Sequence, residues 1–319
     1  MKIVHISDLH LNTFFKNSNL KNIKYLLKRA LEMKFDHLAI TGDLTDNADP
    51  KDFEILRNLF KSNGLLESNR LSLVIGNHDI FGGIQAPEDI FNFPDKCSST
   101  NYRKKVIEFG NYFNETFNES VLRFKEDFFP FVKVIDGILI LGINSIAEYS
   151  RMKNPFASNG KISKSILENV DRLLKAYGLN CKYKIILIHH HFNKIKLDSK
   201  SSTHSVWQNF EKQTMKLKKK KRILNVFKQN SVNLVLHGHW HQNLEYNRYG
   251  IRFFNGGASI KGNMPDEMKL NVIKIEEDKV TTETHRITAN SSSVIHKNVL
   301  VINPEVNKEM ISIRNAVNY

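Results

Sequence analysis

Short apolar runs alternate with amphipathic segments through the first eighty residues, and this alternation limits the fold more than any other feature. The apolar runs at residues 2–7, 36–43 and 71–79 have the length and β-branched content of strands. The segments between them, residues 19–33 and about 52–60, carry apolar residues at helical spacing. Strands separated by helices in this way predict an α/β fold, with helices on the faces of a parallel or mixed sheet.

The rest of the chain continues this pattern with further strands. Residues 131–136 and 137–145 read as two strands joined by a hairpin turn at Asp136-Gly137. Residues 163–178 form an amphipathic helix for which Ser163 is a candidate N-cap. We expect the remaining strands in the segments 182–191, 232–241 and 251–259, and an antiparallel hairpin at the sheet edge over residues 270–287.

Composition limits the class of protein. A hydrophobic content of 41% is typical of a globular chain with a full core. No segment approaches the roughly 18 uninterrupted apolar residues of a membrane span, and the N-terminus lacks the pattern of a signal peptide. Cys97 and Cys181 are too few for a disulfide framework. We therefore expect a cytoplasmic protein without a membrane span.

The formal net charge of +14 would favour anionic partners, including nucleic acid. The excess is scattered lysine, with one dense run from Lys216 to Arg222. Such a run is more typical of a solvated helix face or loop than of a nucleic-acid site. The charge therefore leaves nucleic acid open as a partner without indicating it, and the oligomeric state is not predicted.

Aspartate, asparagine and histidine residues follow five of the predicted strands. In open α/β sheets, ligands collect beyond the carboxyl ends of strands, so these residues should converge. The set comprises Asp8, His10, Asp43, Asp46, Asn77, His78, His189, His239 and His241. An aspartate at a strand end can also cap the following helix, but five strand ends with metal-ligand side chains indicate a metal site.

The ligand types suggest which metals would bind. Carboxylate and amide oxygens combined with imidazoles, and without thiolates, suit iron, manganese or zinc rather than calcium or a thiolate-bound structural zinc. Seven protein ligands are too many for one ion but suit two, provided that one carboxylate is shared. Two such ions can activate a shared water and stabilise an in-line phosphoryl displacement. The leading prediction is therefore phosphoester hydrolysis.

The order D-x-H, G-D-x-x-D, G-N-H-D, H-H and G-H-x-H, from Asp8 to His241, resembles the calcineurin-like metallophosphoesterase superfamily. The resemblance implies a four-layer α/β/β/α sandwich with mixed sheets and a helical insert. It implies that Asp8, His10 and His241 bind the first metal, that Asn77, His189 and His239 bind the second, and that Asp43 bridges them.

The resemblance also orders the histidine clusters. In an extended chain His237, His239 and His241 would all project from one face. The family motif selects His239 and His241, which leaves His237 as a neighbour. In the second cluster it selects His189 as the ligand and places His190 near the substrate phosphate, while His191 stands where many relatives have proline.

Three further roles complete the predicted site. His78 is the expected general acid toward the leaving alkoxide, or a donor to phosphate oxygen, and it needs an acidic partner to stay protonated. The resemblance implies Asp46 as that partner, with Asp79 as the alternative. Asn77 would ligate without adding negative charge and keep its NH₂ group for phosphate, so the predicted substrate contacts are Asn77, His78 and His190.

Within the superfamily the chain looks most like the bacterial class III cyclic nucleotide phosphodiesterases. This similarity rests on the start MKIVHISDLHL, the segment NGGAS and residues 154–174. The expected substrate is a phosphodiester, such as a 3′,5′-cyclic nucleotide. A DNA-repair-type nuclease and a non-catalytic scaffold on the same fold are the alternatives.

We expect a phosphoesterase domain over residues 1–285, with a helical insert at about 84–130 and a C-terminal extension over 286–319. The insert is rich in aromatic residues, which could pack a helical cap or stack on a base; core packing is the favoured interpretation. These residues are Phe91, Phe93, Tyr102, Phe109, Tyr112 and Phe113.

Overall fold

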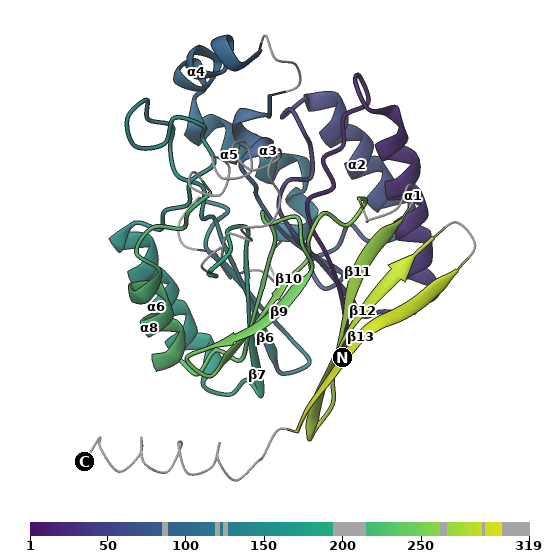
Figure 1. The fold of residues 1–319 in the computed structure, drawn as a ribbon. Coiled ribbons are helices and arrows are strands. Elements are labelled where there is room, and N and C mark those ends of the chain that lie inside the picture. Colours follow the sequence, from purple (N-terminus) through teal and green to yellow (C-terminus); the bar gives the residue numbers. More distant parts are fainter. Residues whose placement is uncertain are drawn as a thin grey trace, which may run out of the picture.

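The computed structural model describes residues 1–84, 89–118, 122–123, 127–193, 215–261, 267–288 and 291–301. Within these residues two mixed β-sheets face each other, and helices cover their outer faces (Figure 1). This arrangement confirms the α/β/β/α layering that the sequence predicted. No helix of the described residues is long and apolar enough to cross a lipid bilayer.

The first sheet has six strands in the order β13-β12-β11-β1-β2-β3. Its strands are β1 (Lys2–Ile6), β2 (His37–Thr41), β3 (Leu71–Val74), β11 (Met268–Ile275), β12 (Lys279–Ile287) and β13 (Ser292–Val301). Strands β1, β2 and β3 are parallel, so their carboxyl ends share one edge of the sheet. Their connections contain α1 (Asn17–Glu32) and α2 (Pro50–Ser62). Pro50 suits the first turn of α2, and Asp49 caps it by accepting from the Lys51 N–H.

The second sheet has seven strands in the order β4-β5-β6-β7-β8-β10-β9. Its strands are β4 (Leu122–Arg123), β5 (Phe131–Ile135), β6 (Ile138–Ile143), β7 (Tyr183–Ile188), β8 (Leu234–His237), β9 (Leu244–Arg248) and β10 (Ile251–Asn255). Helices α6 (Lys164–Gly178) and α8 (Lys220–Gln229) lie on its outer face (Figure 1). Ser163 caps α6 by accepting from the Ile166 N–H, as predicted.

The parallel strands are apolar on both faces because both faces are buried. In β7, Ile185 and Leu187 pack into the large core between the sheets, whereas Ile186 and Ile188 pack into the cluster beneath α6 and α8. Each such side chain stabilises the fold by about 1.5–3 kcal/mol. The sheets are thereby held rigidly at the edge where the polar strand ends emerge.

The predicted helical insert contains α4 (Asp89–Ser99), α5 (Tyr102–Tyr112) and a 3₁₀ turn at Asn114–Phe117, and it follows the short helix α3 (His78–Phe81). Most of its aromatic residues pack into the core, as the favoured interpretation required. Phe93, Phe109 and Phe113 are buried, and Tyr102 and Tyr112 pack against the same cluster. Phe91 is the exception, because its side chain is exposed.

The C-terminal region differs from the sequence expectation. The predicted hairpin forms as β11 and β12, but it is not the edge of the sheet, because β13 pairs with β12. The expected domain boundary at residue 285 therefore falls inside β12. Residues 291–300 are exposed, so no burial alternation marked this strand in the sequence. Residues 302–319 of the predicted extension lie outside the described residues.

The basic run from Lys216 to Arg222 does not form a single helix face. Leu217 forms a bridge with Gly160, and only the last three residues of the run belong to α8. Lys218 and Lys220 donate to the carbonyl oxygens of Lys153 and Asn193. Part of the run therefore holds loops in place.

Candidate metal centre

The ends of β1, β2, β3, β7 and β8 bring the predicted ligands together. Asp8, His10, Asp43 and His239 all have positive φ angles, between 43° and 67°. This left-handed region is uncommon for residues other than glycine, although aspartate and histidine enter it more readily than most. Four left-handed residues that follow β1, β2 and β8, strands of two different sheets, therefore indicate a functional constraint on the backbone, since strain of this kind collects at active sites.

A first group of ligand atoms comes from Asp8, His10 and His241. His10 Nε2 lies 3.2 Å from His241 Nε2, and His241 Nε2 lies 3.6 Å from Asp8 Oδ1. Asp8 and His10 are buried, whereas the side chain of His241 is 49% exposed. This group is therefore open toward solvent on the side of His241.

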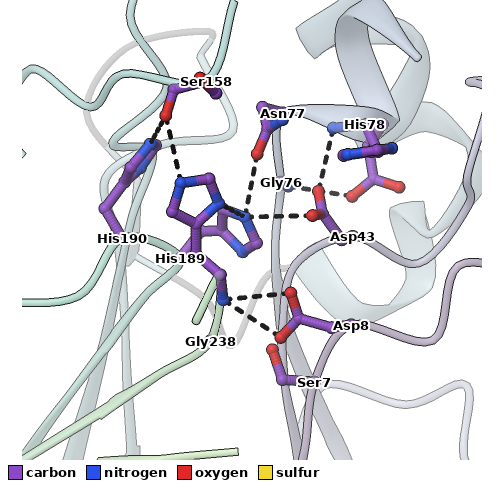
Figure 2. Close-up of polar contacts among 12 residues, drawn as sticks. Ser7, Asp8, Asp43, Gly76, Asn77, His78, Ser158, His189, His190 and Gly238 are labelled. Carbon is purple, nitrogen blue, oxygen red and sulfur yellow. Dashed lines mark hydrogen bonds and ion pairs between the residues drawn. The ribbon is translucent and has the colours of Figure 1, made fainter. Parts of the chain in front are cut away.

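A second group comes from Asp43, His189 and His239, and Asn77 joins it (Figure 2). His189 Nε2 lies 3.0 Å from His239 Nδ1, 3.2 Å from Asn77 Oδ1 and 3.3 Å from Asp43 Oδ2. All four residues are buried. Four potential ligand atoms thus surround one small volume.

Asp43 lies between the two groups. Its Oδ2 atom is 3.3 Å from His189 Nε2 and 3.8 Å from His10 Nε2, so the same oxygen faces both. The other oxygen, Oδ1, accepts from the His78 backbone N–H at 2.9 Å. This bond fixes the orientation of the carboxylate and leaves Oδ2 directed at both groups.

The hydrogen bonds of the second group show that it fits a cation. His189 Nδ1 lies 2.8 Å from the Thr41 carbonyl, and His239 Nε2 lies 3.1 Å from the Ser158 carbonyl. Because carbonyls only accept, these nitrogens carry the hydrogens, and the lone pairs of His189 Nε2 and His239 Nδ1 face each other. Two lone pairs 3.0 Å apart repel unless a cation or a proton lies between them.

The distances between the candidate ligand atoms also fit a bound cation. Two ligands held about 2.1 Å from one ion stand roughly 2.9–3.4 Å apart, depending on the coordination angle. The three contacts of His189 Nε2, from 3.0 to 3.3 Å, fall in this range. The group of Asp8, His10 and His241 is slightly wider, at 3.2–3.6 Å.

Two glycines allow this close approach. A Cβ atom on Gly76 would lie 2.1 Å from Asp43 Oδ1 and 2.2 Å from the Asp43 backbone nitrogen. On Gly238 it would lie 1.9 Å from Ser7 Oγ and 2.4 Å from Asp8 Oδ2. Both glycines belong to the motifs identified in the sequence, and any other residue there would displace a candidate ligand.

The buried carboxylates make the centre attractive to cations. Burial opposes their charge, but the neighbouring histidines outweigh it and lower the pKa of both Asp8 and Asp43. Burial likewise opposes a charged His189, yet Asp43 and Asp8 raise the pKa of this imidazole to about 9. The local field therefore stabilises positive charge at the position that a bound ion would occupy.

His78 and Asp46 lie beside the first group. His78 Nδ1 is 3.3 Å from Asp46 Oδ1 and 3.1 Å from the Asp46 carbonyl, and His10 Nδ1 is 3.3 Å from the same Oδ1. Burial opposes charging of His78, but Asp43 and Asp46 raise its pKa to about 9. One carboxylate thus orients a candidate ligand and a candidate acid together.

Asp79, the alternative partner of His78, is oriented differently. Its Oδ1 accepts from the N–H and hydroxyl of Thr45, and its Oδ2 accepts from the Gly76 N–H. Burial raises the pKa of Asp79 to about 7. These bonds tie together the loops after β2 and β3, so Asp79 has a structural position and Asp46 is the carboxylate in contact with His78.

The other members of the two histidine clusters, His190, His191 and His237, are buried around the candidate ligands. His237 is the last residue of β8, and its Nε2 contacts the Tyr246 hydroxyl at 2.8 Å. The chain turns after β8, so His237, His239 and His241 do not share one strand face. His190 has both ring nitrogens engaged, Nδ1 with Ser145 Oγ and Nε2 with the Ser158 carbonyl, so contact with a substrate would require one of these bonds to be exchanged.

Sequence reasoning did not identify three groups that hold this site. The carbonyls of Thr41 and Ser158 orient His189 and His239, and backbone groups leave no signal in the residue type. Lys16 Nζ lies 2.8 Å from Asp46 Oδ2. A lysine in a lysine-rich chain carried no distinguishing signal either.

The family model for calcineurin-like phosphoesterases matches residues 1–243, about three quarters of the chain. The chain belongs to this family. It is therefore a metallophosphoesterase, a hydrolase of phosphoester bonds, and the family binds two metal ions. No curated protein matches its sequence.

Solved structures share the fold of this calcineurin-like phosphoesterase at low sequence identity. A dimetal phosphatase from Danio rerio superposes with a TM-score of 0.59 at 11% identity, covering 95% of this chain and 99% of that one. A purple acid phosphatase from yellow lupin (Lupinus luteus) seeds gives 0.58 at 14%, covering 96% of this chain and 54% of that one. GAP50, the anchor in the inner membrane complex of Plasmodium, gives 0.52 at 12%, covering 95% and 89%. These similarities establish the fold.

Proposed function

We propose that this protein is a phosphodiesterase with two metal ions. Asp8, His10 and His241 would hold one ion, and Asn77, His189 and His239 the other. The observation that carries the proposal is the position of Asp43, whose Oδ2 faces both groups from 3.3 and 3.8 Å. Two bound cations would supply an activated water and stabilise charge on the phosphoryl group.

The side chains around the two groups suit the remaining tasks. His78 is 27% exposed and held by Asp46, so it can donate a proton to the leaving oxygen or a hydrogen bond to a phosphate oxygen. Asn77 contributes a neutral oxygen to the second group, so its NH₂ group remains available to the substrate. The neutral ligand also leaves the centre more positive, which favours an anionic substrate.

The ligand types support iron, manganese or zinc as the metals. Imidazole nitrogens and carboxylate or amide oxygens make up both groups, and both described cysteines, Cys97 and Cys181, are outside them. Free cysteines also suit the cytoplasm, which we propose as the location.

We propose a phosphodiester, such as a 3′,5′-cyclic nucleotide, as the substrate. The support is the resemblance of the sequence to the class III cyclic nucleotide phosphodiesterases in the start MKIVHISDLHL, the segment NGGAS and residues 154–174. A nuclease activity is the second candidate, and the net charge of +14 is the observation in its favour. A nuclease would lose activity on DNA steeply as salt rises, because its phosphate contacts release counterions.

The test compares substrates with the purified protein after metal removal and reloading with Mn²⁺. Hydrolysis of bis(p-nitrophenyl) phosphate that disappears on chelation supports the diesterase. Faster turnover of 3′,5′-cyclic AMP than of single-stranded DNA supports the cyclic nucleotide, and the reverse order supports the nuclease. Binding of two metals without turnover of any of these esters would overturn the proposal and leave the scaffold alternative.

Variants at matched surface histidines sharpen this test. The side chains of His241 and His296 are similarly exposed, at 49% and 52%, but only His241 belongs to a ligand group. His241→Ala should remove most of the activity and lower the metal content, whereas His296→Ala should change neither. Equal effects of the two substitutions would contradict the ligand role of His241.

A further inference from the structure

Two phenylalanines are presented to solvent on the connection between β1 and α1. The side chains of Phe14 and Phe15 are 84% and 59% exposed, and their ring centroids lie 4.6 Å apart with the planes at 78°. Adjacent exposed aromatic rings forgo the stabilisation that burial would provide. The pair therefore needs an explanation other than core packing.

The turn that carries the pair is well fixed. The Lys16 N–H donates to the Asn12 carbonyl at 2.9 Å, which closes the turn, and the Phe15 N–H donates to Asn12 Oδ1. The backbone N–H and the hydroxyl of Thr13 both donate to Asp52 Oδ1, at 3.2 and 2.7 Å. These bonds hold the two rings outward from a defined position on the surface.

Both ends of the turn attach to Asp46, one of the two candidate catalytic residues. Lys16 Nζ lies 2.8 Å from Asp46 Oδ2, Asn12 Nδ2 lies 3.5 Å from the same atom, and the Asp46 N–H donates to the Leu11 carbonyl. The other Asp46 oxygen contacts His78, the candidate donor to the leaving group. The turn therefore lies against Asp46 and, through it, beside His78, the residue proposed to protonate the leaving group.

We propose that Phe14 and Phe15 form a stacking surface for a planar aromatic group, such as a nucleobase, on the leaving-group side of the substrate. This inference rests on the proposed phosphodiesterase function and adds the residues that would contact the aromatic part of its substrate. Aromatic side chains stack on bases without reading their edges, so the pair would select nucleotides and aryl esters over aliphatic phosphoesters without choosing among bases.

The experiment measures how strongly the Mn²⁺-loaded protein prefers a phosphate that carries a base. Calorimetry gives the dissociation constants of adenosine 5′-monophosphate and of ribose 5-phosphate, and their ratio is the readout. We expect the wild-type protein to bind the nucleotide about tenfold more tightly. Phe14→Leu combined with Phe15→Leu should reduce this preference at least about fivefold, because leucine keeps the apolar bulk but lacks an aromatic face.

Phe91→Leu is the matched control, since Phe91 is also 84% exposed but lies on α4. It should leave the preference unchanged. An equal preference in the wild type and the double variant, or an equal loss in Phe91→Leu, would overturn the inference. Failure of the wild type to bind either phosphate would instead show that the proposed metal centre, and with it the proposed function, is wrong.

A lipid surface is the competing occupant of an exposed aromatic pair. Sedimentation with vesicles of phosphatidylcholine and phosphatidylglycerol distinguishes a lipid surface from a planar aromatic group. The assay compares the wild-type protein with the double variant Phe14→Ala and Phe15→Ala. Loss of vesicle binding in this variant, together with an unchanged preference for the nucleotide, would overturn the stacking surface in favour of membrane contact. No vesicle binding by the wild type, together with a reduced preference in the leucine variant, supports it.

Discussion

Lys16 Nζ contacts one oxygen of Asp46 at 2.8 Å, and the other oxygen of the same carboxylate contacts the rings of His10 and His78, each at 3.3 Å. Asp46 is buried, while Lys16 is partly exposed. The lysine therefore restricts the orientation of a carboxylate that itself orients a candidate ligand and a candidate acid.

Replacement of Lys16 by methionine should lower kcat on bis(p-nitrophenyl) phosphate by roughly tenfold, the low end of the loss when a residue that orients a metal site is removed. Metal content should stay the same, because Lys16 touches no candidate ligand. Lys16→Arg should recover most of the activity, since a guanidinium can also bind the carboxylate. Lys164→Met, which removes a surface ion pair on α6, is the control. No loss in Lys16→Met would show that Asp46 needs no such partner.

Replacement of Gly76 by alanine should displace Asp43 and lower the metal content of the purified protein. The added Cβ would lie 2.1 Å from Asp43 Oδ1 and 2.2 Å from its backbone nitrogen, so the carboxylate cannot keep its position. Elemental analysis of the purified variant measures the effect. Gly250→Ala is the control, because a Cβ there meets no atom within 4 Å and the cost is confined to a turn with positive φ. Full metal content in Gly76→Ala would contradict the bridging position of Asp43.

His239→Gln should empty the second metal position, whereas His237→Gln should retain both ions. The two residues are two positions apart and both are buried, but His239 faces His189 and His237 faces Tyr246. Glutamine keeps the polarity of both sites and limits unfolding. Metal content and the free energy of unfolding should be measured for both variants. Loss of an ion in His237→Gln but not in His239→Gln would show that His237, and not His239, is the metal ligand.

His37 should make the fold sensitive to acid. Burial lowers the pKa of His37 to about 3, whereas the unfolded chain titrates near 6.5. Between pH 6.5 and pH 3 the His37 side chain is protonated in the unfolded chain but not in the folded protein. Protonation therefore stabilises the unfolded state, and the free energy of unfolding decreases as the pH falls below 6.5. At pH 5 the contribution of His37 to this loss is about 2 kcal/mol relative to pH 7.

Denaturant unfolding of the metal-free wild-type protein and of the variant His37→Gln at pH 7 and pH 5 isolates this contribution. His37→Gln should reduce the loss of stability on acidification by about that amount, although it can also lower the stability at both pH values. His296→Gln, at an exposed position on β13, should not change the loss. An identical loss in His37→Gln and in the wild type would show that His37 does not titrate with folding.

The sequence identified the residues that the structure brings together as candidate ligand groups, because their residue types are unusual where strands end. Aspartate and histidine can enter the left-handed conformation that Asp8, Asp43 and His239 adopt, and the adjacent glycines leave room for them. Apolar runs and helical spacing were likewise sufficient for an α/β fold, because both faces of the parallel strands are buried, whereas the two-sheet, four-layer arrangement followed only from the resemblance to the family.

The parts that the sequence did not predict depend on tertiary contacts. Strand β13 is exposed on both faces, so it lacks the alternation by which strands are recognised. Strand periodicity alone did not separate His237 from His239, because the separation comes from the turn after β8, and the resemblance to the family motif was needed to distinguish them. The roles of the Thr41 and Ser158 carbonyls depend on backbone direction alone. The position of the turn that carries Phe14 depends on the hydrogen bonds of Thr13 with Asp52, a residue on α2.

The central claim is that two metal ions share Asp43, and the electron paramagnetic resonance spectrum of the Mn²⁺-loaded protein tests it most directly. We expect two Mn²⁺ ions per chain with the spectrum of an exchange-coupled pair, and loss of this coupling in Asp43→Asn. A single ion per chain, or two ions with uncoupled spectra in the wild-type protein, would contradict the account.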